Sequence, residues 1–116
     1  MQPTIEAVGD VTIVAVNVDE LDANNADDFR SAVAPVLKDS RKLVLDLGHV
    51  RFVDSRGCGV ILSCLKLLAP AGGDLKLCGV NPTVRMVFDL IRMHKICEIV
   101  NTREEAVLAF QKGKQP

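Results

Sequence analysis

The sequence predicts an α/β fold, with a mixed β-sheet made of an N-terminal hairpin and parallel strands and covered by about four helices. Three observations predict it. The chain opens with short β-branched runs, later apolar runs alternate with stretches of helical spacing, and glycine or proline breaks separate the two kinds. The helical stretches are long enough to connect parallel strands. With 116 residues, 48% of them hydrophobic, we expect a single domain over 1–116.

Two strands and a helix are expected first. Thr4–Val8 and residues 11–18 are apolar and β-branched, and the Gly-Asp dipeptide between them predicts a hairpin. Helical spacing then begins, with Asn24 or Asn25 as a cap. Pro35 falls late in this helix, and an interior proline costs about 3 kcal/mol in a straight helix, so we expect a kink or an early stop there.

The middle of the chain predicts a central strand followed by a turn and a second helix. Residues 42–47 form a nearly continuous apolar run, and residues 50–53 either extend this strand or form a second short piece. The hexapeptide 54–59, Asp-Ser-Arg-Gly-Cys-Gly, interrupts the apolar pattern. Helical spacing resumes at Val60 and lasts until Pro70, so we expect the hexapeptide to be a strand-to-helix turn.

The last third alternates in the same way. Residues 75–78 predict a strand, and the Asn-Pro pair at 81–82 predicts a helix N-cap followed by proline in the first turn. Residues 96–100 can supply a final strand, and 102–105 have the form of a capping box at the start of a fourth helix. The polar residues 111–116 predict a frayed tail.

Charge and composition exclude several kinds of function. The net charge is −1 and acidic and basic residues are intermixed, so the sequence indicates no basic surface that would bind nucleic acid or anionic lipid. We find neither a secretory leader nor an apolar stretch that could span a membrane, and therefore expect a cytoplasmic protein with no direct nucleic-acid or membrane contact.

The cysteines are spread singly, at Cys58, Cys64, Cys78 and Cys97, with no Cys-x-x-Cys pair. Only His94 lies at a ligand-like step from one of them, and two potential ligands do not make a site. We expect buried, reduced thiols that act as small apolar side chains, with no metal, no disulfide framework and no cofactor.

The hexapeptide is the candidate site, because ligands and chemistry gather at the carboxyl ends of parallel strands. Ser55 can cap the following helix through its oxygen, or it can be a phosphorylation site whose charge the helix N-terminus tolerates. Gly57 and Gly59 either give a partner close access to the backbone or allow tight helix-to-strand packing. The segment is neither a phosphate-binding loop nor a Gly-x-Ser-x-Gly hydrolase elbow.

Residues 42–60 resemble the signature of the STAS family, the domain shared by sulphate transporters and bacterial anti-sigma-factor antagonists. In this family, an apolar strand ending in Asp-Leu is followed by Phe-hydrophobic-Asp-Ser-Ser/Thr-Gly-Leu-Gly. Glu-Leu-Asp at 20–22 and Leu-Cys-Gly at 77–79 resemble further family segments, so the resemblance covers nearly the whole chain.

The resemblance implies a protein without catalytic activity, whose serine after the aspartate, Ser55, is phosphorylated by a partner. That partner is an anti-sigma factor that doubles as a serine protein kinase, and a phosphatase can reverse the modification. The unphosphorylated protein binds the anti-sigma factor and frees the sigma factor, and the phosphorylated protein lets go. The expected switch surface comprises Asp22, Asp54, Arg56, Gly57, Cys58 and Gly59.

The chain departs from the family pattern at four positions. Arg56 replaces a small hydroxyl residue, and can either neutralise a phosphate or obstruct a kinase. Cys58 stands where leucine is common, and Asp19 and Arg92 stand where glycine is frequent. Two other interpretations stay open: a STAS scaffold that is never phosphorylated, and a nucleotide or small-molecule sensor built around Asp22, Asp54 and the Gly57 turn.

Overall fold

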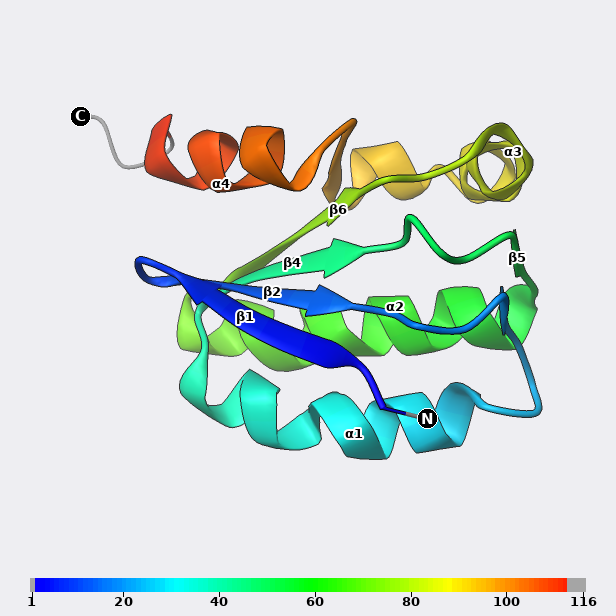
Figure 1. Cartoon of the computed structure of the whole chain (residues 1–116), viewed down its shortest axis with the longest axis horizontal. Coiled ribbons are helices and arrows are strands. Elements are labelled where there is room, and N and C mark those ends of the chain that lie inside the picture. Colours follow the sequence, from blue (N-terminus) through cyan, green and yellow to red (C-terminus); the bar gives the residue numbers. More distant parts are fainter. Residues whose placement is uncertain (1, 113–116) are drawn as a thin grey trace.

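The computed structural model describes residues 2–112 (Figure 1). The strands are β1 (Thr4–Val8), β2 (Val11–Ala15), β3 (Glu20–Leu21), β4 (Lys42–Asp46), β5 (Phe52–Val53), β6 (Asp74–Cys78) and β7 (Glu98–Val100). The helices are α1 (Ala26–Asp39), α2 (Ser55–Leu68), α3 (Pro82–Leu90) and α4 (Arg103–Lys112), with short 3₁₀ turns at Ala69–Ala71 and Met93–Lys95. No helix in this part of the chain is long and apolar enough to cross a bilayer.

A mixed sheet lies at the centre, as the alternating pattern predicts. Five strands pair in the order β1-β2-β4-β6-β7, with β1 and β2 antiparallel and every later pairing parallel. The expected hairpin is therefore confirmed, although β2 ends at Ala15 rather than at 18. The segment 50–53 forms the second short piece, β5, which pairs in parallel with β3, a two-residue strand that the sequence patterns did not predict.

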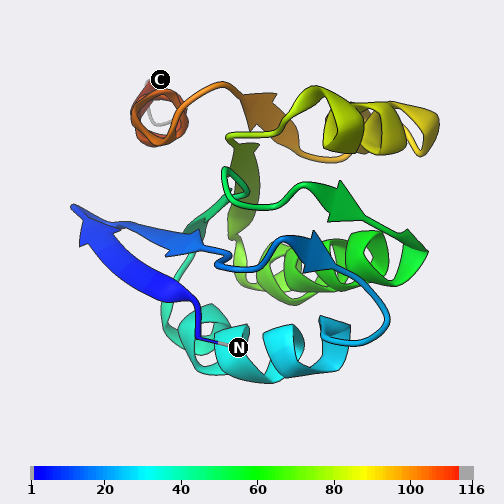
Figure 2. The same ribbon diagram turned by 45° about the vertical axis from the view of Figure 1, so that its right-hand side comes forward.

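The helices cover the two faces of the sheet unequally. α1 and α2 pack together on one face, α4 lies on the other, and α3 packs against β5 at one end of the molecule (Figures 1 and 2). The larger buried cluster lies between the sheet and the helices α1 and α2, and it includes Val14, Leu43, Leu45, Phe29, Val33, Ile61, Leu75 and Leu77. A smaller cluster beneath α4 comprises Val11, Ile13, Val44, Cys78, Ala106 and Phe110.

The alternation of side chains along the strands explains these two clusters. Leu43 and Leu45 of β4 face α1 and α2, whereas Val44 between them faces α4. All three are fully buried, because β4 is a central strand with a helix layer on each side.

α1 continues past its proline. Pro35 lies inside the helix, which ends only at Asp39, so of the two expected outcomes, a kink or an early stop, the early stop is wrong. Pro35 is exposed, so the carbonyl that loses its intrahelical partner to the proline is on the solvent side, where water can replace the missing bond.

α4 begins where the capping box predicts. Thr102 Oγ1 accepts a hydrogen bond from the backbone N–H of Glu105 at 3.1 Å, and the helix starts at Arg103. Gln111 and Lys112 belong to this helix, so the expected tail does not begin at 111. The rest of the predicted frayed tail, residues 113–116, lies outside the described residues.

Candidate functional site

Asp54 caps the helix that follows it. One carboxylate oxygen, Oδ1, accepts a hydrogen bond from the backbone N–H of Gly57 at 2.9 Å, and α2 begins at Ser55. We expected the hexapeptide 54–59 to be a strand-to-helix turn. It is instead the N-cap of α2, Asp54, followed by the first helical residues. The interpretation of Ser55 as the capping side chain is also wrong, because the residue before it takes that place.

The other Asp54 oxygen joins α2 to a distant segment. Oδ2 accepts from the backbone N–H of Ala23 at 3.1 Å, in the loop between β3 and α1. The backbone N–H of Gly57, then that of Ala23, together with the charge of Arg56, hold the pKa of Asp54 below its usual value, against the opposing effect of desolvation. The carboxylate is therefore ionised at neutral pH and fixed in place by both bonds.

Ser55 is the first residue of α2, and it is exposed. Its hydroxyl makes no hydrogen bond to any residue between 2 and 112, so the side chain is available to a partner. The first turn of α2 contains no acidic residue. A negative group on Ser55 would thus meet the positive end of the helix dipole, with Asp54 and Arg56 as its two neighbouring charges along the chain.

Asp22 shapes the loop that faces this helix start. Its carboxylate accepts from the backbone N–H of Asn24 at 2.9 Å, and its own N–H donates to Asn25 Oδ1 at 3.0 Å. Asn25 is the N-terminal neighbour of α1, as predicted, but its side chain closes the loop instead of capping the helix. Asp22 and Asp54 therefore both bind backbone N–H groups of the loop between β3 and α1. Asp54 also binds the start of α2, whereas the carboxylate of Asp22 binds the loop.

The two glycines of the hexapeptide have opposite surroundings. Gly57 is buried, and a Cβ atom there would lie 2.1 Å from the carbonyl oxygen of Leu21 and 2.7 Å from Val53 Cγ1. Gly59 is exposed, and a Cβ atom there would meet nothing within 4 Å. Gly57 therefore permits close packing of α2 against β3 and β5, whereas Gly59 leaves an open stretch of helix surface beside Ser55.

Arg56 and Cys58 point to different environments. The Arg56 guanidinium lies 3.7 Å from Asp27 Oδ1 of α1, and both side chains are mostly exposed. Such an exposed pair holds the arginine weakly, so the guanidinium can turn toward another anion. Cys58 is buried, and burial, helped by the charge of Asp54, raises the pKa of its thiol.

All four cysteines are free and buried, so the prediction of buried thiols that behave as apolar side chains is confirmed. Burial raises the pKa of Cys64 to about 11 and that of Cys78 to about 12, which keeps both thiols protonated at neutral pH. Within residues 2–112, no group of three or more histidine, cysteine or acidic side chains is placed to hold a metal ion.

A group of exposed apolar side chains at the end of the molecule where α2 begins was missed by the sequence patterns. Phe52 of β5 is 42% exposed, and Met86 and Leu90 of α3 are 68% and 84% exposed. We call these three side chains, with Ile91, the β5–α3 patch. They lie at the end of the molecule where α2 begins, because β5 leads directly into Asp54 and α3 packs against β5 (Figure 2).

A signal for this patch is present in the sequence. The buried face of α3 contains Val84 and Phe88, and Met86 and Leu90 are apolar residues that fall on its opposite side. Ile91 continues the helical spacing of Val84 and Phe88, but α3 ends at Leu90 and Ile91 is 41% exposed. In α2, by contrast, Val60 and Ile61 are buried, so that helix offers little apolar surface beside Ser55.

Comparison with known proteins points to one family. The STAS domain model matches residues 2–106 of the chain. The anti-sigma F factor antagonist of Paenibacillus polymyxa is 33% identical over 94 residues, which cover 79% of this chain and 80% of that protein.

Solved structures agree with this match. The crystal structure of an anti-sigma factor antagonist from Mycobacterium paratuberculosis is similar with a TM-score of 0.84 and 25% identity, over 93% of this chain and 92% of that one. The anti-sigma factor antagonist SpoIIAA in its unphosphorylated form has a TM-score of 0.70 and 20% identity, over 96% and 98% of the two chains. SpoIIAA of Bacillus in its phosphorylated form has a TM-score of 0.70 and 22% identity, over 93% and 98%. The SpoIIAA likeness shows the fold alone.

Proposed function

The chain belongs to the STAS domain family, and from this premise we propose that it is an antagonist of an anti-sigma factor, switched by phosphorylation of Ser55. The partner is an anti-sigma factor that is also a serine protein kinase. The unphosphorylated protein binds this partner and frees a sigma factor, and the phosphorylated protein releases it. A phosphatase returns the protein to its binding form, and the protein itself acts as a regulator rather than as an enzyme.

The exposed, unbonded hydroxyl of Ser55 at the first position of α2 is the observation that carries this proposal. A kinase needs a hydroxyl that it can reach without unfolding the substrate, and α2 presents one. The homologues named anti-sigma factor antagonists support the choice of partner. SpoIIAA, a protein of the same fold, exists in phosphorylated and unphosphorylated forms.

The effect of the phosphate would be electrostatic and local. A phosphoserine adds about −1.5 to −2 charges at neutral pH. The positive end of the α2 dipole tolerates this charge, so the fold persists. The partner would instead meet a dianion beside the ionised Asp54, and burying these two like charges in an interface is unfavourable.

The β5–α3 patch supplies the apolar part of the proposed docking surface. Large apolar side chains that are exposed on a small domain favour contact with a protein partner. Phe52 lies two residues before the cap of α2, so a partner seated on this patch would also reach Ser55. One surface can therefore both bind the anti-sigma factor and carry the group that dislodges it.

Phosphorylation itself is tested by incubating the protein with its cognate anti-sigma factor and ATP, followed by peptide mass spectrometry. We expect one phosphate, on the peptide containing Ser55, and none on Ser55→Ala. Ser63→Ala is the matched control, because Ser63 lies on the same helix but donates its hydroxyl hydrogen to the Gly59 carbonyl oxygen at 2.9 Å. Phosphate that persists in Ser55→Ala would contradict the site assignment.

A second candidate function is a STAS scaffold that is never phosphorylated, and Arg56 favours it. Arg56 stands directly after Ser55, where the family has a small hydroxyl residue, and its guanidinium pairs with Asp27 of α1. In this case Ser55→Asp would leave partner affinity unchanged.

A nucleotide sensor is less well supported by the same residues. Both Asp54 oxygens already accept backbone hydrogen bonds, and Gly57 is packed against Leu21.

A further inference from the structure

The sheet is covered less completely on the α4 face than on the other. Five strands lie about 4.8 Å apart, and a helix with its side chains is about 10 to 12 Å wide, so covering one face takes two helices. α1 and α2 supply two helices on one face. On the opposite face α4 packs against β2, β4, β6 and β7, and β1, the outer strand of the hairpin, is exposed along its whole length (Figure 1).

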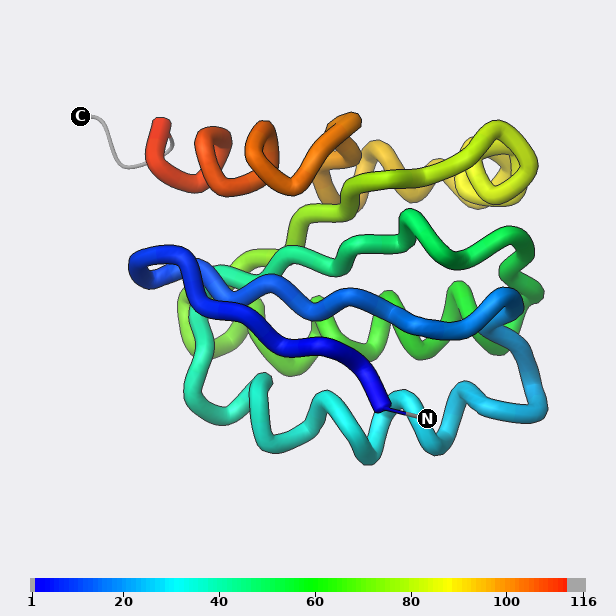
Figure 3. Tube along the Cα trace, in the orientation of Figure 1, coloured from blue at the N-terminus to red at the C-terminus, as the bar shows by residue number. Residues whose placement is uncertain are grey.

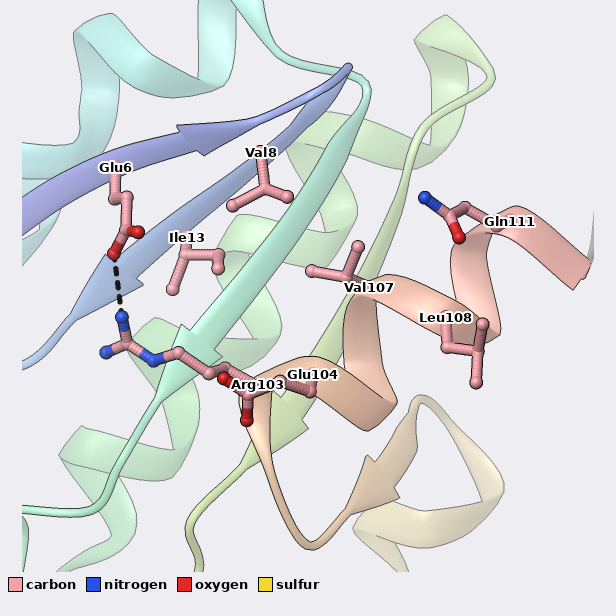
Figure 4. A pocket seen from close by; sticks show the side chains of 8 residues that line it. All are labelled: Glu6, Val8, Ile13, Arg103, Glu104, Val107, Leu108 and Gln111. Carbon is pink, nitrogen blue, oxygen red and sulfur yellow. Dashed lines mark hydrogen bonds and ion pairs between the residues drawn. The ribbon is translucent and has the colours of Figure 1, made fainter.

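A cleft of about 380 Å³ lies between α4 and this hairpin. Val8 and Ile13 point into it from the hairpin, and Val107 points into it from α4 (Figure 4). The α4 residues that line it, Arg103, Glu104, Val107, Leu108 and Gln111, form one stripe along the helix. Such a stripe is the side of a helix that usually contacts a neighbouring helix.

Two apolar side chains extend this surface beyond the cleft. Val8 is 37% exposed and Leu108 is 49% exposed, and they border the cleft from β1 and α4 respectively. Ile13 at the base is already buried. An occupant would therefore add contacts at the rim and along α4, as a rod-shaped element does, rather than fill a deep hole.

The charged side chains at the cleft are mostly acidic. Arg103 is its one cation in the described chain, and its guanidinium is bound to Asp46 and, at 2.7 Å, to Glu6 Oε1. Its hydrogen bond to Asp46 raises the pKa of Arg103, so the guanidinium stays positively charged, and the carboxylates of Asp46 and Glu6 balance that charge. Glu104 at the rim has no ion-pair partner within residues 2–112, and it leaves an unbalanced negative charge beside Leu108.

We propose that this cleft is a second interaction surface, which takes an amphipathic helix of a partner protein with apolar residues on one side and lysine or arginine at its edge. The partner helix would lie beside α4 and complete the helical layer over the hairpin. Its basic residues would face Glu104. The surface is remote from Ser55 along the chain and uses other elements, so it does not depend on the proposed switch.

The test uses a synthetic helix of about 16 residues, long enough to form a helix, with leucines on one side and lysines on the other and a fluorescent label. Binding to the full chain is followed by fluorescence anisotropy. We expect Leu108→Glu to weaken binding by about tenfold or more, because it puts a charge in the apolar contact. Leu67→Glu is the matched control, because Leu67 is a 60% exposed leucine of α2 on the opposite face of the sheet, and its affinity should equal that of the unchanged protein.

A charge exchange separates a specific contact from simple stickiness. Glu104→Lys should weaken the lysine peptide by roughly twofold to fivefold and strengthen a peptide with glutamates in place of the lysines. Equal losses with Leu108→Glu and Leu67→Glu, an unchanged peptide preference in Glu104→Lys, or no binding by the unchanged protein would each overturn the proposal. So would a dimer of this chain that Leu108→Glu dissociates, because the occupant would then be a second copy.

Discussion

The carboxylate of Asp54 joins two parts of the proposed switch surface, the start of α2 and the loop before α1. One oxygen fixes the first turn of α2 and the other fixes the loop before α1. Ser55 follows directly and carries no such duty, since its hydroxyl is unbonded within the described chain. Because a structural aspartate and an unbonded serine divide these roles, the proposed phosphorylation of Ser55 would not disturb the helix start.

Replacing Asp54 should therefore cost stability. Asp54→Ala removes a helix cap and the bond to Ala23, and we expect it to lower the free energy of unfolding by about 1 to 2 kcal/mol. Denaturant unfolding at pH 7 measures this loss. Asp54→Asn should lower the free energy of unfolding by less than Asp54→Ala, because its amide oxygen can still accept the hydrogen bond from Gly57. It should still cost some stability, because its amide nitrogen cannot accept the hydrogen bond from Ala23.

The same carboxylate predicts a pH dependence. The folded pKa of Asp54 lies below its ordinary value, so its contribution is fully present above the unfolded pKa, about 3.9, and is lost as the pH falls through the folded pKa. In Asp54→Asn, this part of the acid dependence should disappear. Such a group titrates over roughly pH 5 to pH 2. If stability fell equally with pH in Asp54→Asn and in the unchanged protein over this range, the assignment would be contradicted.

Arg92 is the one residue other than glycine with a positive φ angle in the described chain, at 57°. The sequence comparison with the family had already marked it, because glycine is frequent there. Arg92→Gly should raise the free energy of unfolding by roughly 0.5 to 1 kcal/mol, since glycine adopts this conformation without the clash of a side chain. Arg85→Gly in α3 is the control, and should instead cost about 1 kcal/mol as an ordinary helix substitution. Destabilisation by both would refute the strain at Arg92.

At the scale of elements, α2 is positioned by its contact with the two-stranded sheet β3–β5. The contact is close because Gly57 has no side chain, and the carbonyl oxygen of Leu21 occupies the place that a Cβ atom would take. Gly59, two residues further along α2, faces open space. One glycine thus sets the distance between α2 and β3, and the other affects only the helix itself.

Alanine substitutions at these two glycines should have opposite effects. Gly57→Ala must displace backbone, and we expect a loss of more than about 3 kcal/mol or failure to fold. Gly59→Ala should stabilise by about 0.5 to 1 kcal/mol, because alanine favours the helix and meets no obstacle. Thermal unfolding of the pair tests the contact directly, and similar melting temperatures would argue against it.

The elements also indicate how far the sequence could predict this molecule. Apolar runs such as residues 42–47 and helical spacing after Asn24 sufficed for the main strands and helices, because a continuous run records a strand buried on both faces and helical spacing records a helix buried on one side. The start of α2 was placed too late, since two glycines and an arginine hide the helical pattern although Asp54 is a common cap residue. β3 has two residues and no periodicity, and its pairing with β5 exists only in the folded chain.

The candidate site was predicted in the same uneven way. Asp54 and Ser55 were found from their place between a strand and a helix and from the family signature, and Asp22 was found from the resemblance alone. The β5–α3 patch was not found, because exposure of Phe52 and Met86 depends on which elements pack over them. The early stop expected at Pro35 failed because a proline on the exposed side of a helix can leave its unpaired carbonyl to water.

Across the whole molecule, the two proposed surfaces use different parts of the fold. The switch surface lies where β5 leads into α2 beside α3, and the second surface lies between the hairpin and α4 (Figures 1 and 3). Between them stands the five-stranded sheet with buried side chains on both faces. The charge on Ser55 would therefore change contacts at one surface while the other remains able to bind.

The central claim is that phosphate on Ser55 ends binding to the anti-sigma factor while the fold persists. Isothermal titration calorimetry of the cognate anti-sigma factor with the unphosphorylated protein and with the Ser55-phosphorylated protein measures it most directly, with melting temperatures of both forms as the control for folding. We predict that phosphorylation weakens binding by about a hundredfold or more, the loss expected when an unpaired charge is placed in an interface, and leaves the melting temperature nearly unchanged. Equal affinities of the two forms would contradict the switch and favour the scaffold interpretation.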